Sequence, residues 1–235
     1  MKLTVIAEGH TKEDRRKLEW GLSFLINDSI LFDAFGHAGV FSRNLIKTRT
    51  DIKKIKSIII SHCHWDHISG IETVLKKKGH PVVYLPEKNS SISKIAGKYG
   101  AEVVTAGKPF KTEEFLLTGP MVSSLKNTVF MEQAAVFNSR FGSVLVAGCS
   151  HPGIVKMVKR AQKLSGRRIY AVTGGLHLKD TAEAQVDKIV NDLKAAGVTK
   201  VIAGHCTGEY AEAQFKKAFK RGFKKLEEKK KYNIV

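Results

Sequence analysis

The residues best suited to chemistry form a dense cluster early in the chain, in residues 61–67 (SHCHWDH). His62 and His64 are two residues apart, so in an extended segment they project to the same side and can both reach one metal ion. Asp66 and His67 follow where the chain turns into a predicted helix, and from there they can reach a second ion. Imidazole and carboxylate together suit zinc, with manganese or iron as alternatives. The cluster therefore predicts a site for one or two metal ions.

Three further histidines each stand directly after a predicted strand, namely His151, His177 and His205. In open α/β layers, ligands bind at the carboxyl ends of strands, so we expect six of the nine histidines to meet at one edge. We expect His151 and His205 to be metal ligands. For His177 we favour contact with the substrate or proton transfer, with metal ligation as the alternative.

Apolar runs and helical patterns that alternate along the chain must position these residues. Their order predicts a mixed α/β sandwich in one domain covering residues 1–235. Asn27 and Asp28 separate two short apolar runs and predict a hairpin turn. The expected strands are 2–7, 23–26, 29–33, 57–61, 82–85, 102–104, 133–137, 143–147, 169–173 and 198–203, and the expected helices are 39–49, 70–78, 87–99, 153–165, 181–196 and 209–230.

The chain is strongly basic, with 40 Lys and Arg against 22 Asp and Glu and a net charge of +18. Such a charge reflects either a solvated surface or an anionic partner. Part of the excess falls in the last predicted helix, where Phe215, Phe219, Phe223 and Leu226 form an apolar stripe that would dock while the basic face meets solvent. Three cysteines without CxxC spacing, no signal peptide and no membrane span predict a cytoplasmic protein without a membrane partner.

The pattern H-x-H-x-D-H of residues 62–67 resembles the signature of the metallo-β-lactamase superfamily, and residues 33–36 (DAFG) resemble the turn that precedes it. The resemblance implies a four-layer αβ/βα sandwich with the metal site at one edge. Within the superfamily, the chain is similar to a cluster of small cytoplasmic metal-dependent hydrolases that includes the archaeal dihydropterin–ribofuranosylaminobenzene phosphate synthase. The segments that carry this closer similarity are 19–24, 148–154, 174–178 and 204–208.

One departure from the superfamily pattern concerns Cys149, which stands where most members have an Asp that bridges two metals. Either His151 supplies the missing ligand, or Cys149 does so as a thiolate, or one metal alone binds well, and we favour His151. We expect Cys63 to point away from the ligands beside it and Cys206 to serve in packing. Trp65, inside the cluster, is either a packing lid or a surface that binds substrate.

These residues predict a metal-dependent, zinc-containing hydrolase. The metals would lower the pKa of a bound water to about 7 so that hydroxide attacks an ester, lactone or phosphoester, with Asp66 orienting the water. The alternative is a transferase of the pterin-condensing kind, in which an arylamine displaces diphosphate. A nuclease or nucleic-acid-binding protein is a third reading, disfavoured because the sequence has no aromatic-rich stacking patch. We expect a small anionic substrate, and the sequence predicts no oligomeric state.

Overall fold

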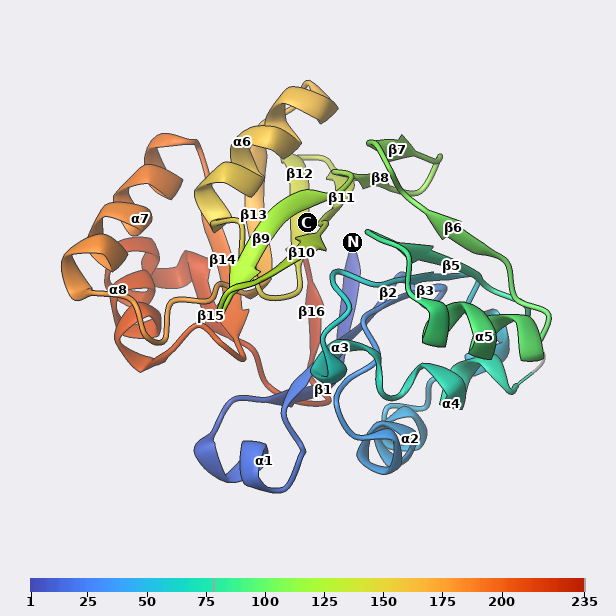
Figure 1. The fold of residues 1–235 in the computed structure, drawn as a ribbon. Coiled ribbons are helices and arrows are strands. Elements are labelled where there is room, and N and C mark those ends of the chain that lie inside the picture. Colours follow the sequence, from blue (N-terminus) through green and yellow to red (C-terminus); the bar gives the residue numbers. More distant parts are fainter. Residues whose placement is uncertain (78, 235) are drawn as a thin grey trace. The chain divides into compact units, whose positions relative to one another are not determined.

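The computed structural model describes residues 1–77 and 79–234 (Figure 1). Its internal contacts divide the chain into two compact units. Unit 1 comprises residues 1–107 and 227–233, and unit 2 comprises residues 108–226 together with Ile234. The organisation as a single domain stays a prediction. Among the described residues, no helix combines the length and the apolar character that a membrane span requires.

Unit 1 contains a seven-stranded sheet in the order β16-β1-β2-β3-β4-β5-β6. The pairs from β16 to β3 are antiparallel, and those from β3 to β6 are parallel. Asn27 and Asp28 have φ of 48° and 61°, as the tight turn between β2 and β3 requires, so the predicted hairpin is confirmed. The strands are β1 Lys2–Gly9, β2 Gly21–Ile26, β3 Ile30–Phe32, β4 Ser57–Ile59, β5 Val82–Leu85, β6 Val103–Thr105 and β16 Lys231–Asn233.

Helices cover one face of this sheet because their apolar residues pack on it. Phe41 of α2 and Ile92 of α5 lie in one buried cluster with Leu31, Ile58 and Val83 from the strands. Burying a side chain of this size stabilises the fold by about 1.5–3 kcal/mol. The helical segments are α1 Lys12–Arg16, α2 Ala38–Lys47, η1 Ile52–Lys54, α3 Trp65–Ile68, α4 Ile71–Leu75 and α5 Ser90–Lys98. The predicted helix 70–78 reaches residue 78, which lies outside the described residues.

Unit 2 contains a second seven-stranded sheet, in the order β15-β14-β13-β12-β11-β8-β7, with a separate hairpin of β9 and β10. Strands β12 to β15 are parallel. Met157 of α6, Val190 of α7 and Phe215 of α8 pack on this sheet in one buried cluster. The elements are β7 Phe110–Lys111, β8 Leu116–Leu117, β9 Met121–Leu125, β10 Thr128–Glu132, β11 Ala135–Ser139, β12 Gly142–Ala147, α6 Ile154–Ser165, β13 Ile169–Gly175, α7 Glu183–Ala195, β14 Lys200–Gly204, α8 Glu209–Phe219, η2 Lys220–Gly222 and β15 Phe223–Lys225.

The helix predicted over 209–230 is wrong beyond Phe219. The chain makes a short 3-10 turn and then adds β15 to the edge of the sheet. Gly222 permits this turn, because a Cβ there would collide with the carbonyl oxygen of Thr199. Phe223 still stacks on Phe215, with 6.3 Å between ring centroids. The helical spacing of the phenylalanines therefore correctly identified residues that share one core. However, Phe223 reaches this core from strand β15 and not from the helix.

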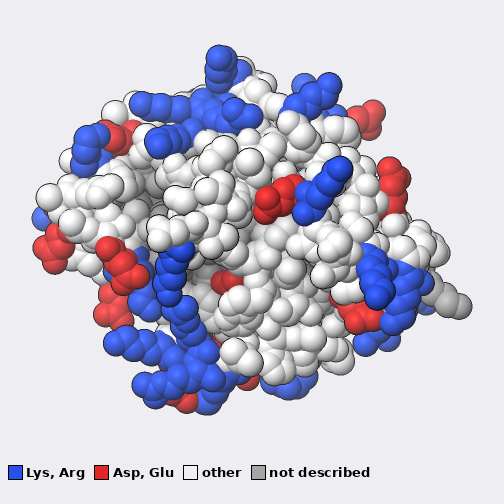
Figure 2. All heavy atoms as spheres, in the orientation of Figure 1, with Lys and Arg blue, Asp and Glu red and all other residues white. Residues whose placement is uncertain are grey.

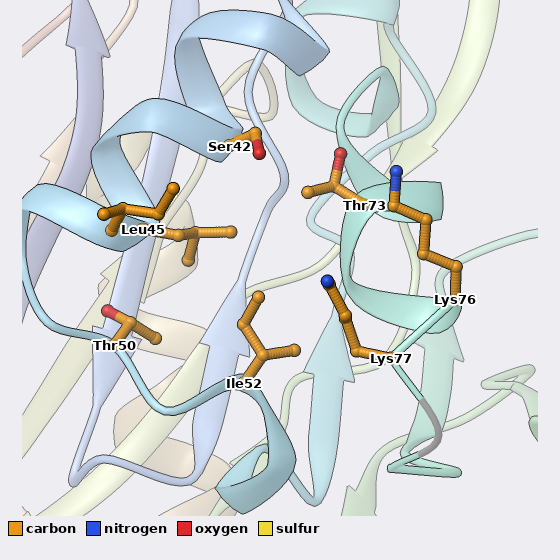
Figure 3. A pocket seen from close by; sticks show the side chains of 8 residues that line it. Ser42, Leu45, Thr50, Ile52, Thr73, Lys76 and Lys77 are labelled. Carbon is orange, nitrogen blue, oxygen red and sulfur yellow. The ribbon is translucent and has the colours of Figure 1, made fainter.

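Unit 1 also carries a cavity of about 230 Å³ beside α2, η1 and α4 (Figure 3). Apolar side chains meet hydroxyl and amino groups in its walls, and Lys77 reaches between α2 and α4. Among the described residues, those that line it are Ser42, Leu45, Ile46, Thr50, Ile52, Thr73, Lys76 and Lys77, and none of them is a predicted site residue.

Candidate metal centre

The four ligands predicted in unit 1 lie together just beyond the end of β4. The ring centroid of His62 is 4.6 Å from that of His64 and 4.1 Å from that of His67. Asp66 and His67 stand on the short helix α3, and Asp66 Oδ2 lies 3.5 Å from His67 Nε2. The structure thus brings together in unit 1 all four residues that the spacing of the cluster singled out.

A buried carboxylate, Asp33, fixes the orientation of this cluster. Nδ1 of His67 donates to Asp33 Oδ2 at 2.7 Å, and the backbone N–H and hydroxyl of Ser61 donate to the same carboxylate at 2.7 Å each. The Ser61 hydroxyl also lies 2.9 Å from Nδ1 of His62. Partners on Nδ1 orient the ring so that Nε2 can serve as a metal ligand. The sequence flagged Asp33 only as part of a turn, and its role in orienting His67 was missed.

The charges around His67 favour a proton on the ring. Burial lowers the pKa of His67, but the carboxylates of Asp66 and Asp33 outweigh burial and raise it well above its usual value. A metal ion would replace this proton, because a histidine ligand must be neutral at the ligating nitrogen. The two carboxylates that favour imidazolium would equally favour a cation held at this place.

Two glycines let α3 lie close to the rest of unit 1. A Cβ at Gly36 would collide with the carbonyl oxygen of Trp20 and would lie 2.6 Å from Cζ3 of Trp65. Gly21 has φ of 133°, and a Cβ there would collide with the carbonyl oxygen of Asp66. The Trp65 side chain packs beside Gly36 with one ring edge while 41% of the residue is exposed. Trp65 therefore packs at one ring edge and is accessible elsewhere, and its binding of substrate stays a prediction.

Cys63 points away from the ligands that flank it, as expected for alternate residues of an extended segment. It packs against the apolar core cluster of unit 1. Burial, and then the charge of Glu87, raise the pKa of the Cys63 thiol to about 11. Cys63 is therefore a protonated, unreactive thiol near neutral pH.

In unit 2, a second buried carboxylate organises the loop that carries His151. Glu132, the last residue of β10, accepts the backbone N–H groups of Cys149, Ser150 and His151 at 3.1, 2.7 and 2.8 Å. Its Oε2 also accepts Nδ1–H of His151 at 2.8 Å. Burial raises the pKa of Glu132, but the hydrogen bonds and charge of His151 outweigh burial and lower it below its ordinary value.

Glu132 was missed by sequence reasoning, although a signal was present. The residue interrupts the largely apolar segment 128–137 (TVFMEQAAVF), in which an unpaired charge would be costly to bury. Such a carboxylate must have donors, and the loop after β12 supplies them. Phe130, on the same strand and two residues earlier, lies edge-on to His151 with 4.9 Å between ring centroids.

The other predicted residues of unit 2 lie beside this loop. The rings of His151 and His177 have centroids 4.3 Å apart. The ligand atoms of Cys149, His151 and His177 lie within 4.8 Å of one another, and so do those of Cys149, His205 and Cys206. Ser150, His177 and His205 have φ of 65°, 51° and 56°. Left-handed conformations at non-glycine residues are strained and cluster at functional sites.

Cys206 contacts two groups of this set. Its Sγ–H donates to the carbonyl oxygen of Cys149 at 3.7 Å, and it forms a hydrogen bond with the His177 side chain. Burial raises the pKa of Cys206, but its hydrogen bonds and the neighbouring His205 and His177 outweigh burial and lower the pKa well below the usual value. The hydrogen bond with Cys206 in turn raises the pKa of His177 above its usual value.

Each unit therefore offers donors that fit a transition metal. Unit 1 contributes three imidazoles and a carboxylate, and unit 2 contributes imidazoles and sulfur. Imidazole, carboxylate and thiolate are the three ligand types of protein zinc sites. In both units a buried carboxylate holds Nδ1 of a ligand candidate, as metal-binding histidines require.

A family model described as the metallo-beta-lactamase superfamily matches residues 21–158, more than half of the chain. The chain belongs to the metallo-β-lactamase superfamily. The match includes the cluster 61–67 and His151, and the predicted α/β fold class is confirmed. The cluster whose pattern resembled the superfamily signature thus lies within the matched residues, and its role in metal binding stays a prediction.

Two curated proteins of Methanocaldococcus jannaschii are similar to this superfamily member. The 7,8-dihydropterin-6-methyl-4-(β-D-ribofuranosyl)-aminobenzene-5'-phosphate synthase is 30% identical, over 88% of this chain and 87% of its own. An uncharacterized protein is 25% identical, over 80% of this chain and 84% of its own.

Among solved structures, a metal-dependent hydrolase of the β-lactamase superfamily has a TM-score of 0.77 at 24% identity, covering 100% of this chain and 99% of that one. The short form of human tRNase Z has a TM-score of 0.64 at 12% identity, with 100% of both chains covered. At these identities the two structures support the fold alone.

Proposed function

We propose that the protein is a metal-dependent hydrolase, zinc being the preferred metal, that acts on a small anionic substrate with an ester, lactone or phosphoester bond. One observation carries the proposal: the complete H-x-H-x-D-H set is assembled in unit 1 with the Nδ1 atom of His67 held by buried Asp33. An orienting carboxylate behind a histidine is the arrangement of metal ligands. The superfamily membership of the chain supports the same conclusion.

In this proposal six side chains hold one or two metal ions: His62, His64, Asp66, His67, His151 and His205. When bound, the metal would supply Lewis acidity, polarising the bond to be broken and neutralising charge on the leaving group. Asp66 has a second role in orienting the attacking water. Manganese and iron are the alternative occupants.

His177 acts as the proton donor in the proposed reaction. The hydrogen bond with Cys206 raises the pKa of His177 above its usual value, which favours the protonated ring. That proton can pass to the leaving oxygen as the bond breaks, and general acid catalysis of this kind contributes about 10²–10⁴-fold in rate. His177 and the exposed part of Trp65 contact the substrate.

The net charge of the chain supports an anionic substrate, and the face drawn in Figure 2 lacks a continuous basic stripe. The net charge is +18, yet Figure 2 shows the Lys and Arg side chains of this face in separate groups with uncharged surface between them. A nucleic-acid-binding protein more often presents a continuous basic stripe. The three cysteines are thiols, as is usual in the reducing cytoplasm, where we place the enzyme.

A second candidate is the transferase reaction of the pterin-condensing synthase. The 30% identity to this synthase over most of both chains favours it. In this chain both candidate reactions would use the proposed metal and His177. They differ in the acceptor, which is water in the hydrolase and an arylamine in the synthase.

The test offers one metal-loaded preparation of the protein either water alone or water and the arylamine as the attacking group. We would incubate the zinc- or manganese-loaded protein with the dihydropterin methyl diphosphate, with and without the ribofuranosyl-aminobenzene phosphate, and in parallel with phosphodiesters, lactones and thioesters. Product formation that needs no amine supports the hydrolase. Condensation in the presence of the amine supports the synthase instead. Turnover of none of these substrates with any metal contradicts both.

A further inference from the structure

Two of the three cysteines lie among the histidines of unit 2. Among the residues of unit 2, the Sγ atom of Cys149 belongs to two groups of potential ligand atoms, one with His151 and His177 and the other with His205 and Cys206, each confined within 4.8 Å. Cys149 is 4% exposed and Cys206 is 6% exposed. Two sulfurs beside an imidazole form a donor set that zinc sites in proteins use.

The backbone around the two sulfurs leaves room for them. Cys149 follows β12 and Cys206 follows β14, and β13 lies between these strands and ends at Gly175. A Cβ at position 175 would lie 2.8 Å from Cys206 Sγ and 2.6 Å from the carbonyl oxygen of Gly148. The sulfur of Cys206 therefore lies against a position where no side chain larger than that of glycine fits.

We propose that Cys149 and Cys206 bind a metal ion as thiolates together with His205, so that unit 2 contains a sulfur-ligated metal site. The inference rests on the proposed function, because the ion is the one that the enzyme uses. On binding, each thiol releases its proton to solvent and each sulfur donates an electron pair to the metal, and nothing is oxidised or reduced. His177 then donates its N–H to the bound sulfur of Cys206, as groups around a metal ligand commonly do.

This assignment makes a prediction about metal preference. Thiolates are soft ligands that select zinc, cobalt and cadmium over manganese and magnesium. A site of imidazoles and carboxylates alone would accept manganese more readily. The assignment also departs from the sequence-based preference for His151 over Cys149, because both cysteines join the ligand set.

Cobalt spectroscopy on the full chain tests the inference independently of activity. The metal-free protein would be loaded with Co²⁺, and the metal content measured by elemental analysis. Sulfur ligation gives an intense thiolate-to-cobalt charge-transfer absorption in the near ultraviolet, whereas the visible bands report cobalt bound by any ligands. The variants are Cys149→Ser, Cys206→Ser and the double variant, with Cys63→Ser as the matched control, because Cys63 packs against the core of unit 1.

We expect the near-ultraviolet band in the wild type and in Cys63→Ser, about half its intensity in each single variant, and none in the double variant. Cobalt-loaded wild type without the band overturns the inference whatever the variants do, and it leaves the proposed function standing. An undiminished band in Cys206→Ser also overturns it. The proposed function fails separately, when protein with the band intact turns over no substrate.

Discussion

The carboxylate of Glu132 accepts Nδ1–H of His151 at 2.8 Å while three consecutive backbone N–H groups donate to the same carboxylate. Four donors on one buried acid fix both the loop after β12 and the tautomer of the histidine. Asp33 does the same for His67 in unit 1, at 2.7 Å. In each unit a buried carboxylate thus holds Nδ1 of a histidine, which leaves Nε2 as the atom that would bind a metal.

Replacing Glu132 by Gln should weaken metal binding without unfolding the protein. An amide can accept from fewer of the four donors, so the loop loses its anchor and His151 its fixed tautomer. We expect the affinity for zinc to fall by about 10- to 100-fold. Competition with a fluorescent chelator measures the affinity, and Glu114→Gln, at an exposed position of unit 2, is the control. Equal affinities in the two variants would contradict the role given to Glu132.

Because the pKa of Glu132 is lowered in the native state, the free energy of unfolding should depend on pH below about 4.5. Its carboxylate is charged in the native state at pH values where the unfolded chain, with the ordinary pKa of 4.5, begins to bind a proton. The contribution is complete above about pH 4.5 and is lost as the pH falls through the lower native pKa. The free energy of unfolding of metal-free protein, measured by denaturant titration, should fall less steeply with acid in Glu132→Gln than in wild type. If the free energy of unfolding falls with acid equally steeply in the two proteins, Glu132 makes no such contribution.

Alanine variants of the histidines should separate metal ligands from the proton donor. His62→Ala and His205→Ala should lose both metal and activity, because each removes a proposed ligand. His177→Ala should keep most of the metal and lose about 10²–10⁴-fold in rate. Elemental analysis measures the bound metal and kinetic assays measure the rate, both on the same preparation of each variant. A His177→Ala protein stripped of metal would show that His177 is a ligand instead.

Two glycine-to-alanine substitutions should change stability in opposite directions. A Cβ at Gly97, in the exposed last turn of α5, meets nothing within 4 Å, so Gly97→Ala should stabilise the protein by about 0.5–1 kcal/mol. Gly175→Ala forces a methyl group against Gly148 and Cys206 and should destabilise by about 1–3 kcal/mol. Thermal unfolding of the metal-free proteins measures both. A stable Gly175→Ala variant would mean that the two sulfurs are less tightly enclosed.

The sequence predicted the parts of the site that are local. His62, His64, Asp66 and His67 fall within six residues, and strand geometry and the following turn suffice to place them together. The carboxylates behind them could not be found this way. Asp33 is 34 residues from His67 and Glu132 is 19 residues from His151, and only the pairing of distant strands makes them partners.

The sequence also misjudged the end of α8 for a physical reason. Phe215, Phe219 and Phe223 satisfy the helical spacing, and Gly222 was the signal that the helix stops. The edge of the parallel sheet offered β14 as a partner for Phe223, and that tertiary pairing outweighed the local preference.

A catalytic metal in this chain should be detectable as bound metal in the purified protein. After removal of metal by a chelator, reconstitution with zinc or manganese and dialysis, we expect at least about one equivalent of bound metal per chain, because a site of histidine and acidic ligands binds tightly. Less than about 0.2 equivalents would contradict it.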